Sequence, residues 1–194
     1  MTFRETLARV KNRGTPPPEF IAALVRWGKT APADIFAVNA EPGDVYTSVR
    51  HVLGPYNGEL HRRAVMLEIL RVLAGFESSW KWTEGRDTTN STSNRPDTEE
   101  AGAFQVSANS QLFGRDLREL VAEHIRDYDH DGDIDHDDFR AGMKLDHPLS
   151  LEYAARLLRH TTRHNGPVKR HEIDPWLSRE AVEEFEAALT EDVK

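Results

Sequence analysis

The sequence predicts a mostly α-helical fold, in which several helices surround one buried central helix and a small β region accompanies them. The central helix is expected over residues 60–76, where apolar residues cover most of the helical circumference. Other apolar-periodic segments are shorter, and at most a small sheet is expected within residues 80–108. We expect one domain over residues 1–194, with a helical extension over 1–50 and an insertion over 115–145.

Start and stop signals place the other elements in order. A capping-box pattern predicts a helix over residues 2–13, and a second helix is expected from Pro18 to Trp27. Residues 86–100 contain no apolar side chain apart from a proline, so they predict an exposed loop. Further helices are expected over 115–126, over 136–144, from Ser150 as the N-cap to His164, and from Ser178 to Leu189.

Composition excludes several classes of protein. The chain has no cysteine, so disulfides, thiolate zinc sites and cysteine nucleophiles are excluded. Its formal net charge of −8 argues against a generic nucleic-acid binder. No apolar run is long enough for a transmembrane helix, and the first residues do not resemble a signal peptide. Seven aspartates lie within residues 127–138, so the rest of the chain is nearly neutral.

The acidic segment over residues 127–138 fits the calcium loop of an EF-hand. Aspartates alternate at loop positions one, three and five, and Gly132 stands at position six, where the chain must turn sharply. Asp138 replaces the usual glutamate at position twelve, which predicts weaker calcium binding or a shift towards magnesium. The alternative is a solvated acidic turn without an ion. The candidate ligands for Ca²⁺ are Asp127, Asp129, Asp131, Asp133, Asp135 and Asp138.

Glu77 is the candidate catalytic acid. It stands at the predicted end of the apolar helix, where the helix dipole disfavours a negative charge, and aromatic neighbours such as Trp80 could desolvate it. Both effects raise a carboxyl pKa, as a general acid at neutral pH requires. The alternative is an ordinary surface glutamate at a helix end.

Three short segments occur in an order that resembles a known superfamily. They are Glu-Ser-Ser-Trp at 77–80, Gly-Ala-Phe-Gln-Val-Ser at 102–107 and His-Asn-Gly-Pro-Val at 164–168. Their order is similar to the signatures of the goose-type lysozyme and lytic transglycosylase superfamily. The resemblance covers about 60–110 and 150–170 and implies a lysozyme-like fold. Two departures are His164, where the family usually has tyrosine, and Phe104 at a methionine-like position.

The resemblance implies cleavage of the β-1,4 bond between N-acetylmuramic acid and N-acetylglucosamine in peptidoglycan. Glu77 would then be the general acid that protonates the glycosidic oxygen. Substrate contacts would come from Gln105 and the backbone of 102–104, and Asn165 would lie near the catalytic carboxyl or the sugar. Ser78 would support the substrate or the surroundings of Glu77. The expected substrate-binding residues are thus Ser78, Gly102, Phe104, Gln105 and Asn165.

Two chemical outcomes remain open. A two-carboxylate hydrolase needs a second acid across the scissile bond, and Asp87 and Asp97 are the candidates in the polar loop. We favour this muramidase reaction. A lytic transglycosylase needs no second carboxylate and leaves 1,6-anhydro products, in which case both aspartates are solvated loop charges. A third alternative is a non-catalytic, calcium-dependent module that binds glycan or a partner protein.

The expected partner is the glycan strand of peptidoglycan, and an inhibitor or immunity protein would accompany an exported enzyme of this kind. With no signal peptide in view, we expect synthesis in the cytoplasm and action on the cell wall after non-classical export or phage-type release. The sequence does not choose between a phage lysin, a delivered effector and a virion enzyme.

Overall fold

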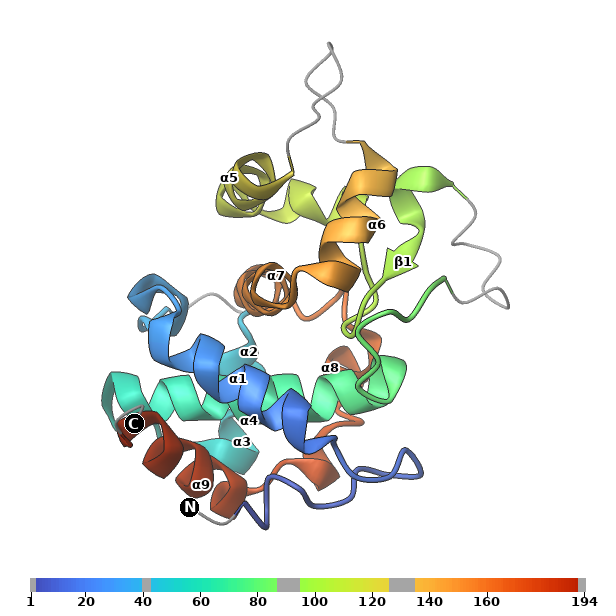
Figure 1. Cartoon of the computed structure of the whole chain (residues 1–194). Coiled ribbons are helices and arrows are strands. Elements are labelled where there is room, and N and C mark those ends of the chain that lie inside the picture. Colours follow the sequence, from blue (N-terminus) through green and yellow to red (C-terminus); the bar gives the residue numbers. More distant parts are fainter. Residues whose placement is uncertain (1–2, 40–42, 87–94, 126–134, 192–194) are drawn as a thin grey trace.

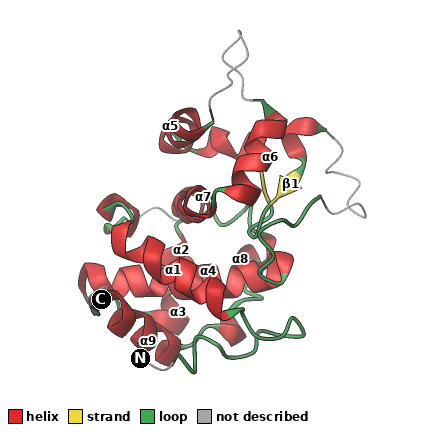
Figure 2. Ribbon diagram, viewed as in Figure 1, coloured by secondary structure: helices red, strands yellow, loops and turns green. Residues whose placement is uncertain are grey.

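The computed structural model describes residues 3–39, 43–86, 95–125 and 135–191 of the chain. This part of the chain is mostly helical and contains one short two-stranded sheet (Figure 2). The predicted mostly helical class is therefore confirmed. No helix within these residues is both long enough and apolar enough to cross a membrane.

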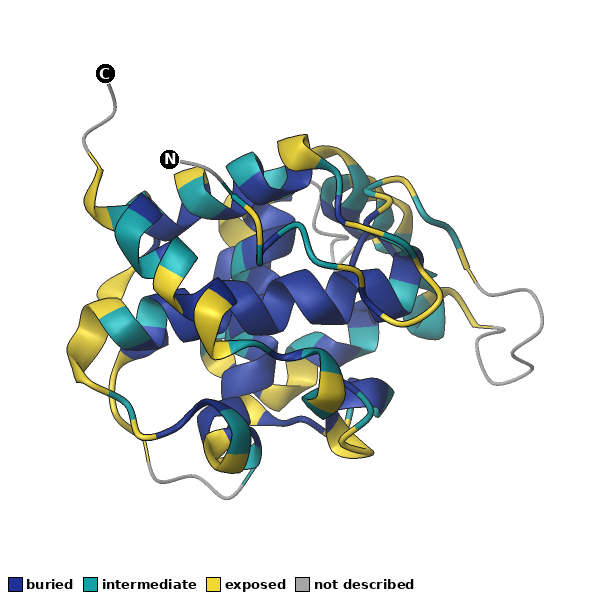
Figure 3. Ribbon diagram, turned by 90° about the horizontal axis from the view of Figure 1, so that it is seen from below, coloured by how far each residue is buried: buried dark blue, intermediate teal, exposed yellow. Residues whose placement is uncertain are grey.

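The central helix is α4, which spans Gly58–Ser78. It runs through the middle of the molecule and is buried along most of its length (Figures 1 and 3). Helices α1 (Pro18–Thr30) and α9 (Arg179–Thr190) pack against it. A Cβ at Gly28 would lie only 2.9 Å from Leu67 Cδ1, so α1 and α4 approach closely at this glycine. The predicted central helix is confirmed, and α1 continues through Gly28 instead of ending there.

The remaining helical segments surround this centre. Residues 126–134 lie outside the described residues, and α5 and α6 flank them, close to the bounds expected from the sequence. The segments, with η marking 3-10 turns, are η1 (Ala33–Phe36), α2 (Val45–Ser48), α3 (Arg50–Leu53), η2 (Pro96–Thr98), η3 (Ala108–Phe113), α5 (Arg115–His124), α6 (His136–Leu145), α7 (His147–His160), α8 (Gly166–Lys169) and η4 (Asp174–Trp176).

Helix α7 begins and ends earlier than expected. The predicted N-cap at Ser150 is wrong, because Asp146 caps the helix: its Oδ1 accepts a hydrogen bond of 3.0 Å from the backbone N–H of Leu149. Pro148 fits this first turn, where its missing N–H costs nothing. The helix also stops at His160 and not at His164, so the residues before Asn165 form a turn.

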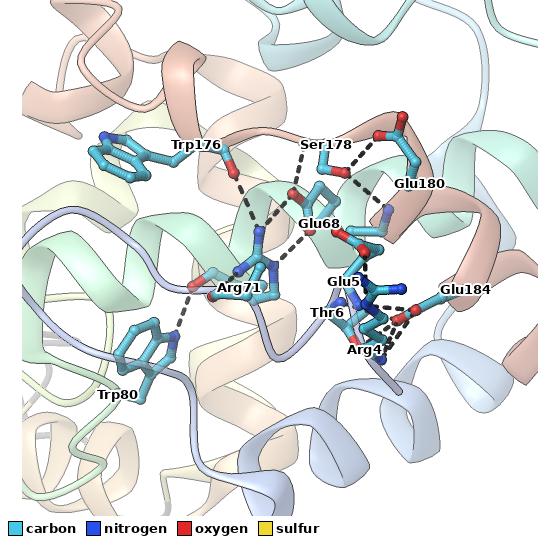
Figure 4. A network of polar contacts seen from close by, with 12 residues as sticks. Arg4, Glu5, Thr6, Glu68, Arg71, Trp80, Trp176, Ser178, Glu180 and Glu184 are labelled. Carbon is cyan, nitrogen blue, oxygen red and sulfur yellow. Dashed lines mark hydrogen bonds and ion pairs between the residues drawn. The ribbon is translucent and has the colours of Figure 1, made fainter. Parts of the chain in front are cut away.

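The helix predicted over residues 2–13 is absent: the described part, from residue 3 onwards, forms turns and one isolated bridge. The physical reason is a contact between this segment and a residue that is distant in the sequence. The carboxylate of Glu184 on α9 accepts hydrogen bonds from the backbone N–H groups of Arg4, Glu5 and Thr6, at 2.8 to 3.1 Å (Figure 4). These groups are satisfied by a tertiary contact and need no helix.

A buried ion pair in α4 fastens both ends of the chain to the core. Arg71 donates to both carboxylate oxygens of Glu68, at 2.7 and 2.8 Å, and both side chains are almost fully buried. Glu68 also accepts from the backbone N–H of Ser178, and Arg71 donates to the carbonyls of Ala8 and Trp176 (Figure 4). A buried pair of this kind is tolerated because further hydrogen bonds complete it.

The small sheet is a hairpin of β1 (Glu100–Ala101) and β2 (Val106–Ser107), which pair antiparallel. Its register places Glu100 opposite Ser107. β1 packs against α6 (Figure 1). The hairpin lies within the region 80–108 where a small sheet was expected.

Candidate active site

Glu77 lies in the last turn of α4 and is partly buried. The helix ends one residue later, at Ser78, because Ser79 and Trp80 adopt left-handed backbone conformations with φ of 56° and 61°. The indole Nε1 of Trp80 then donates to the carbonyl of Arg71 at 2.8 Å, which folds the chain back against the helix. Glu77 is thus held on a fixed backbone at the negative end of the helix dipole.

The surroundings raise the pKa of Glu77 from 4.5 to about 7. Burial is the largest cause, and the carboxylate of Glu100 is the next, whereas the guanidinium groups of Arg170 and Arg13 act in the opposite direction. Within the described residues, no group donates a hydrogen bond that would stabilise the ionised carboxylate of Glu77. Near neutral pH, a substantial fraction of this side chain is therefore protonated.

Glu100 was missed by the sequence analysis, which considered only Asp87 and Asp97 as the second acid. The signal available in the sequence was only its place directly before Ala101 and the second motif segment; its proximity to Glu77 comes from the packing of the hairpin. Asp87 lies outside the described residues. Asp97 forms an ion pair of 2.9 Å with Arg95 and lines a cavity whose lining does not include Glu77, so its position does not favour a role beside Glu77.

Ser78 joins the end of α4 to the hairpin. Its buried hydroxyl lies 2.9 Å from the carbonyl of Ala103 and 3.1 Å from that of Ala74, and it accepts from the backbone N–H of Lys81. The hydroxyl of Ser78 therefore already has hydrogen-bond partners within the protein both as a donor and as an acceptor. Of its two expected roles, the geometry favours support of the surroundings of Glu77 over direct contact with substrate.

The hairpin turn depends on Gly102 and Gln105. Gly102 has φ of +75°, and a Cβ there would lie 2.5 Å from the carbonyl oxygen of Met143. Gln105 also has a left-handed backbone, and its Nε2 donates to the carbonyl of Gly102 at 3.0 Å. The ring of Phe104 is buried and packs against the stacked rings of Phe20 and Trp82, so only its backbone could face a ligand.

The third segment reaches the same end of α4 through α8, which packs against that helix (Figure 1). Asn165, just before α8, is buried, and its Nδ2 has no hydrogen-bond partner among the described residues. His164 Nε2 lies 3.3 Å from Ser107 Oγ, and burial lowers the pKa of His164. The contacts from Ser78 to Ala103 and from Ser107 to His164 join the three segments. Arg170, two residues after the third segment, is near enough to Glu77 for its charge to act on the pKa of that residue.

The described residues include only part of the predicted calcium loop. Asp127, Asp129, Asp131 and Asp133 lie outside them. Asp135 caps α6, because its Oδ1 accepts from the backbone N–H groups of Asp137 at 2.7 Å and Asp138 at 3.1 Å. These hydrogen bonds lower the pKa of Asp135. Asp138 is exposed beside a cavity of about 610 Å³.

A second cavity of about 610 Å³ lies between η1, α2 and the start of α4, where Tyr46, Tyr56 and Arg62 line it. Neither of these cavities includes Glu77. The candidate active site is therefore defined by its convergent residues and their electrostatics and not by the volume of a cavity.

Comparisons with protein-family models, with curated proteins and with solved structures found no match to this chain.

Proposed function

We propose that this chain is a peptidoglycan-degrading muramidase, which cleaves the β-1,4 bond between N-acetylmuramic acid and N-acetylglucosamine with Glu77 as the general acid. The observation that carries the proposal is the raised pKa of Glu77, about 7, at the point where the three segments converge. A carboxyl that remains protonated near neutral pH can protonate the glycosidic oxygen as the bond breaks.

Glu100 supplies the second carboxylate of the proposed reaction. It is close enough to Glu77 for its charge to raise the pKa of that residue. A pair of carboxyl groups that flank the scissile bond is the arrangement on which hydrolytic glycosidases depend. Glu77 would give its proton to the oxygen of the leaving sugar. Glu100 would either accept a proton from the attacking water or attack the glycosyl carbon as the nucleophile.

The surrounding polar groups suit a sugar polymer with acidic substituents. The buried Nδ2 of Asn165 has an unused N–H donor, and a hydroxyl or acetamido oxygen of a sugar could accept a hydrogen bond from it. Arg13 and Arg170 bring positive charge towards Glu77, where Glu100 and Glu172 bring negative charge. The two cations are complementary to carboxylates of peptidoglycan.

Digestion of purified sacculi tests the proposal. Wild-type protein should release soluble muropeptides, and Glu77→Gln should release almost none. Glu100→Gln should also lower the rate strongly, whereas Glu99→Gln is the matched control, because the carboxylate of Glu99 is already engaged by Arg86 and Arg140. Equal and negligible release by wild type and Glu77→Gln would refute catalysis.

The products separate the two chemical alternatives. Mass spectrometry should find reducing ends if water is the acceptor, and 1,6-anhydro ends would identify a lytic transglycosylase instead. Glycan binding without turnover, unaffected by Glu77→Gln, would identify the non-catalytic binding module.

We also propose that residues 127–138 bind one calcium ion, which stabilises the fold by linking α5 and α6. The support is the ligand pattern of the sequence and the two helices that flank it. A ligand that binds only the native state raises its stability. Chelation should therefore lower the melting temperature and calcium should restore it, and an unchanged melting temperature across a calcium titration would refute the proposal.

A further inference from the structure

Two histidines and an aspartate from three separate segments meet on the surface. His51 comes from α3, His171 follows α8, and Asp174 begins η4. His51 Nε2 lies 2.7 Å and His171 Nδ1 3.1 Å from the same oxygen, Asp174 Oδ2. Among the described residues, this is the one group of three or more His, Asp or Glu side chains whose donor atoms all lie within 4.8 Å of one another.

We propose that His51, His171 and Asp174 form a binding site for a divalent transition-metal ion of the zinc type. Two imidazole nitrogens and one carboxylate oxygen are a ligand set that Zn²⁺ accepts readily, with water in the remaining position. Calcium and magnesium prefer oxygen ligands alone, so the site is chemically distinct from the acidic segment.

The distances fit such an ion after a small adjustment. Ligands about 2.0–2.1 Å from a tetrahedral zinc ion stand about 3.3–3.4 Å apart from one another. The two nitrogens lie 2.7 and 3.1 Å from the aspartate oxygen, so each needs to move away from that oxygen by only a few tenths of an ångström. The His51 and His171 side chains are 57% and 55% exposed, which leaves them free to make this movement.

A second observation concerns the other oxygen of Asp174. Its Oδ1 is buried and has no hydrogen-bond partner among the described residues. An unsatisfied buried acceptor on a carboxylate is costly, and a cation bound to the same carboxylate would reduce that cost by offsetting its charge. His171 also adopts a left-handed backbone with φ of 56°, a conformation that non-glycine residues adopt mainly where the surroundings require it.

The competing explanation is an ion pair between protonated histidine and aspartate. The chain offers a matched control for it, because His160 Nε2 lies 2.6 Å from Asp116 Oδ1 and no second histidine of the described residues joins this pair. If His51 and His171 only form ion pairs with Asp174, replacing either of them should affect metal binding no more than replacing His160 does.

Calorimetric titration with Zn²⁺ tests the proposal on metal-free protein at slightly alkaline pH, in saturating calcium so that the acidic segment is occupied. We expect one Zn²⁺ per chain in the wild type. His51→Ala and His171→Ala should each weaken binding at least tenfold, because loss even of a group outside the coordination shell costs about 10–100-fold. His160→Ala should bind like the wild type.

Cobalt provides a second measurement, since Co²⁺ bound in a tetrahedral site gives visible absorption bands that the two site variants should lose. Circular dichroism of each variant confirms that it folds. Failure of the wild type to bind Zn²⁺ stoichiometrically would overturn the proposal. Binding that survives both His51→Ala and His171→Ala would overturn it equally, because the ion would then lie elsewhere, such as at the acidic segment.

Discussion

Replacing Glu77 by glutamine should make the protein more stable, and the gain should depend on pH. In the native state the pKa of Glu77 is about 7, against an ordinary value of 4.5. Between these two pH values the native state binds more protons than the unfolded state, so the stability of the wild type falls as the pH rises. Above about pH 7 the full cost of ionising a partly buried carboxyl is present, and below pH 4.5 it is absent.

The size of the effect follows from the same values. At about 1.36 kcal/mol per pH unit, the interval from 4.5 to about 7 sets an upper limit of about 3 kcal/mol. Water reaches part of the carboxyl and screens its charge, and the glutamine amide needs hydrogen bonds of its own. We therefore expect a gain of about 1–2 kcal/mol at alkaline pH, which corresponds to a rise of roughly 2–8 °C in Tm for a chain of this size.

Urea denaturation of wild type and Glu77→Gln across this pH range is the assay. The difference in the free energy of unfolding should be small at the acid end, grow through the interval and become constant above it. Glu19→Gln, on the exposed first turn of α1 and without an ion-pair partner among the described residues, measures what the loss of a glutamate charge does by itself. A difference that is constant with pH, or equal to that of Glu19→Gln, would refute the raised pKa and with it the electrostatic basis of the proposed function.

Three further predictions concern the frame around this residue. Glu100→Gln should lower the pKa of Glu77, because a negative neighbour is removed, so the loss of activity with rising pH should begin at a lower pH in the pH–rate profile. Gly102→Ala should destabilise the fold by about 1–3 kcal/mol from the left-handed backbone alone, with a further cost from the clash, as measured by urea denaturation. Arg71→Met should cost about 3–5 kcal/mol, because it leaves the charge of Glu68 buried without its partner; replacing both residues with apolar ones of similar size should cost less in the same assay.

Sequence reasoning succeeded where one strong local pattern determined the structure. The apolar circumference over 60–76 could only be a buried helix, and Ser178 does cap α9 by accepting from the N–H of Ala181. The structure joins the three motif segments through Ser78–Ala103 and Ser107–His164, contacts that the sequence could not provide. The function assigned to this convergence remains a proposal.

The sequence failed where tertiary contacts replaced local ones. The capping-box pattern near the N-terminus was real, but Glu184, about 180 residues away, accepts from the same N–H groups that a helix would have left unsatisfied. Glu68 and Arg71 interrupt an otherwise apolar helix; their i,i+3 spacing allows a pair, but nothing local indicates that the pair is buried. Glu100 was missed because proximity to Glu77 depends on how the hairpin packs and not on spacing along the chain.

The contacts that build the candidate site do not involve the carboxyl group of Glu77. The hydroxyl of Ser78 hydrogen-bonds the hairpin, the hydroxyl of Ser107 contacts His164, and the indole of Trp80 hydrogen-bonds the backbone of α4. None of these contacts uses the carboxyl of Glu77. The site can therefore keep its shape whether Glu77 is protonated or ionised, which is what an acid that loses and regains a proton in every cycle requires. This explains why Glu77→Gln is expected both to stabilise the fold and to abolish activity. The ionised carboxyl of Glu77 lowers the stability of the native state, and the neighbouring residues keep their arrangement without any contact to that carboxyl.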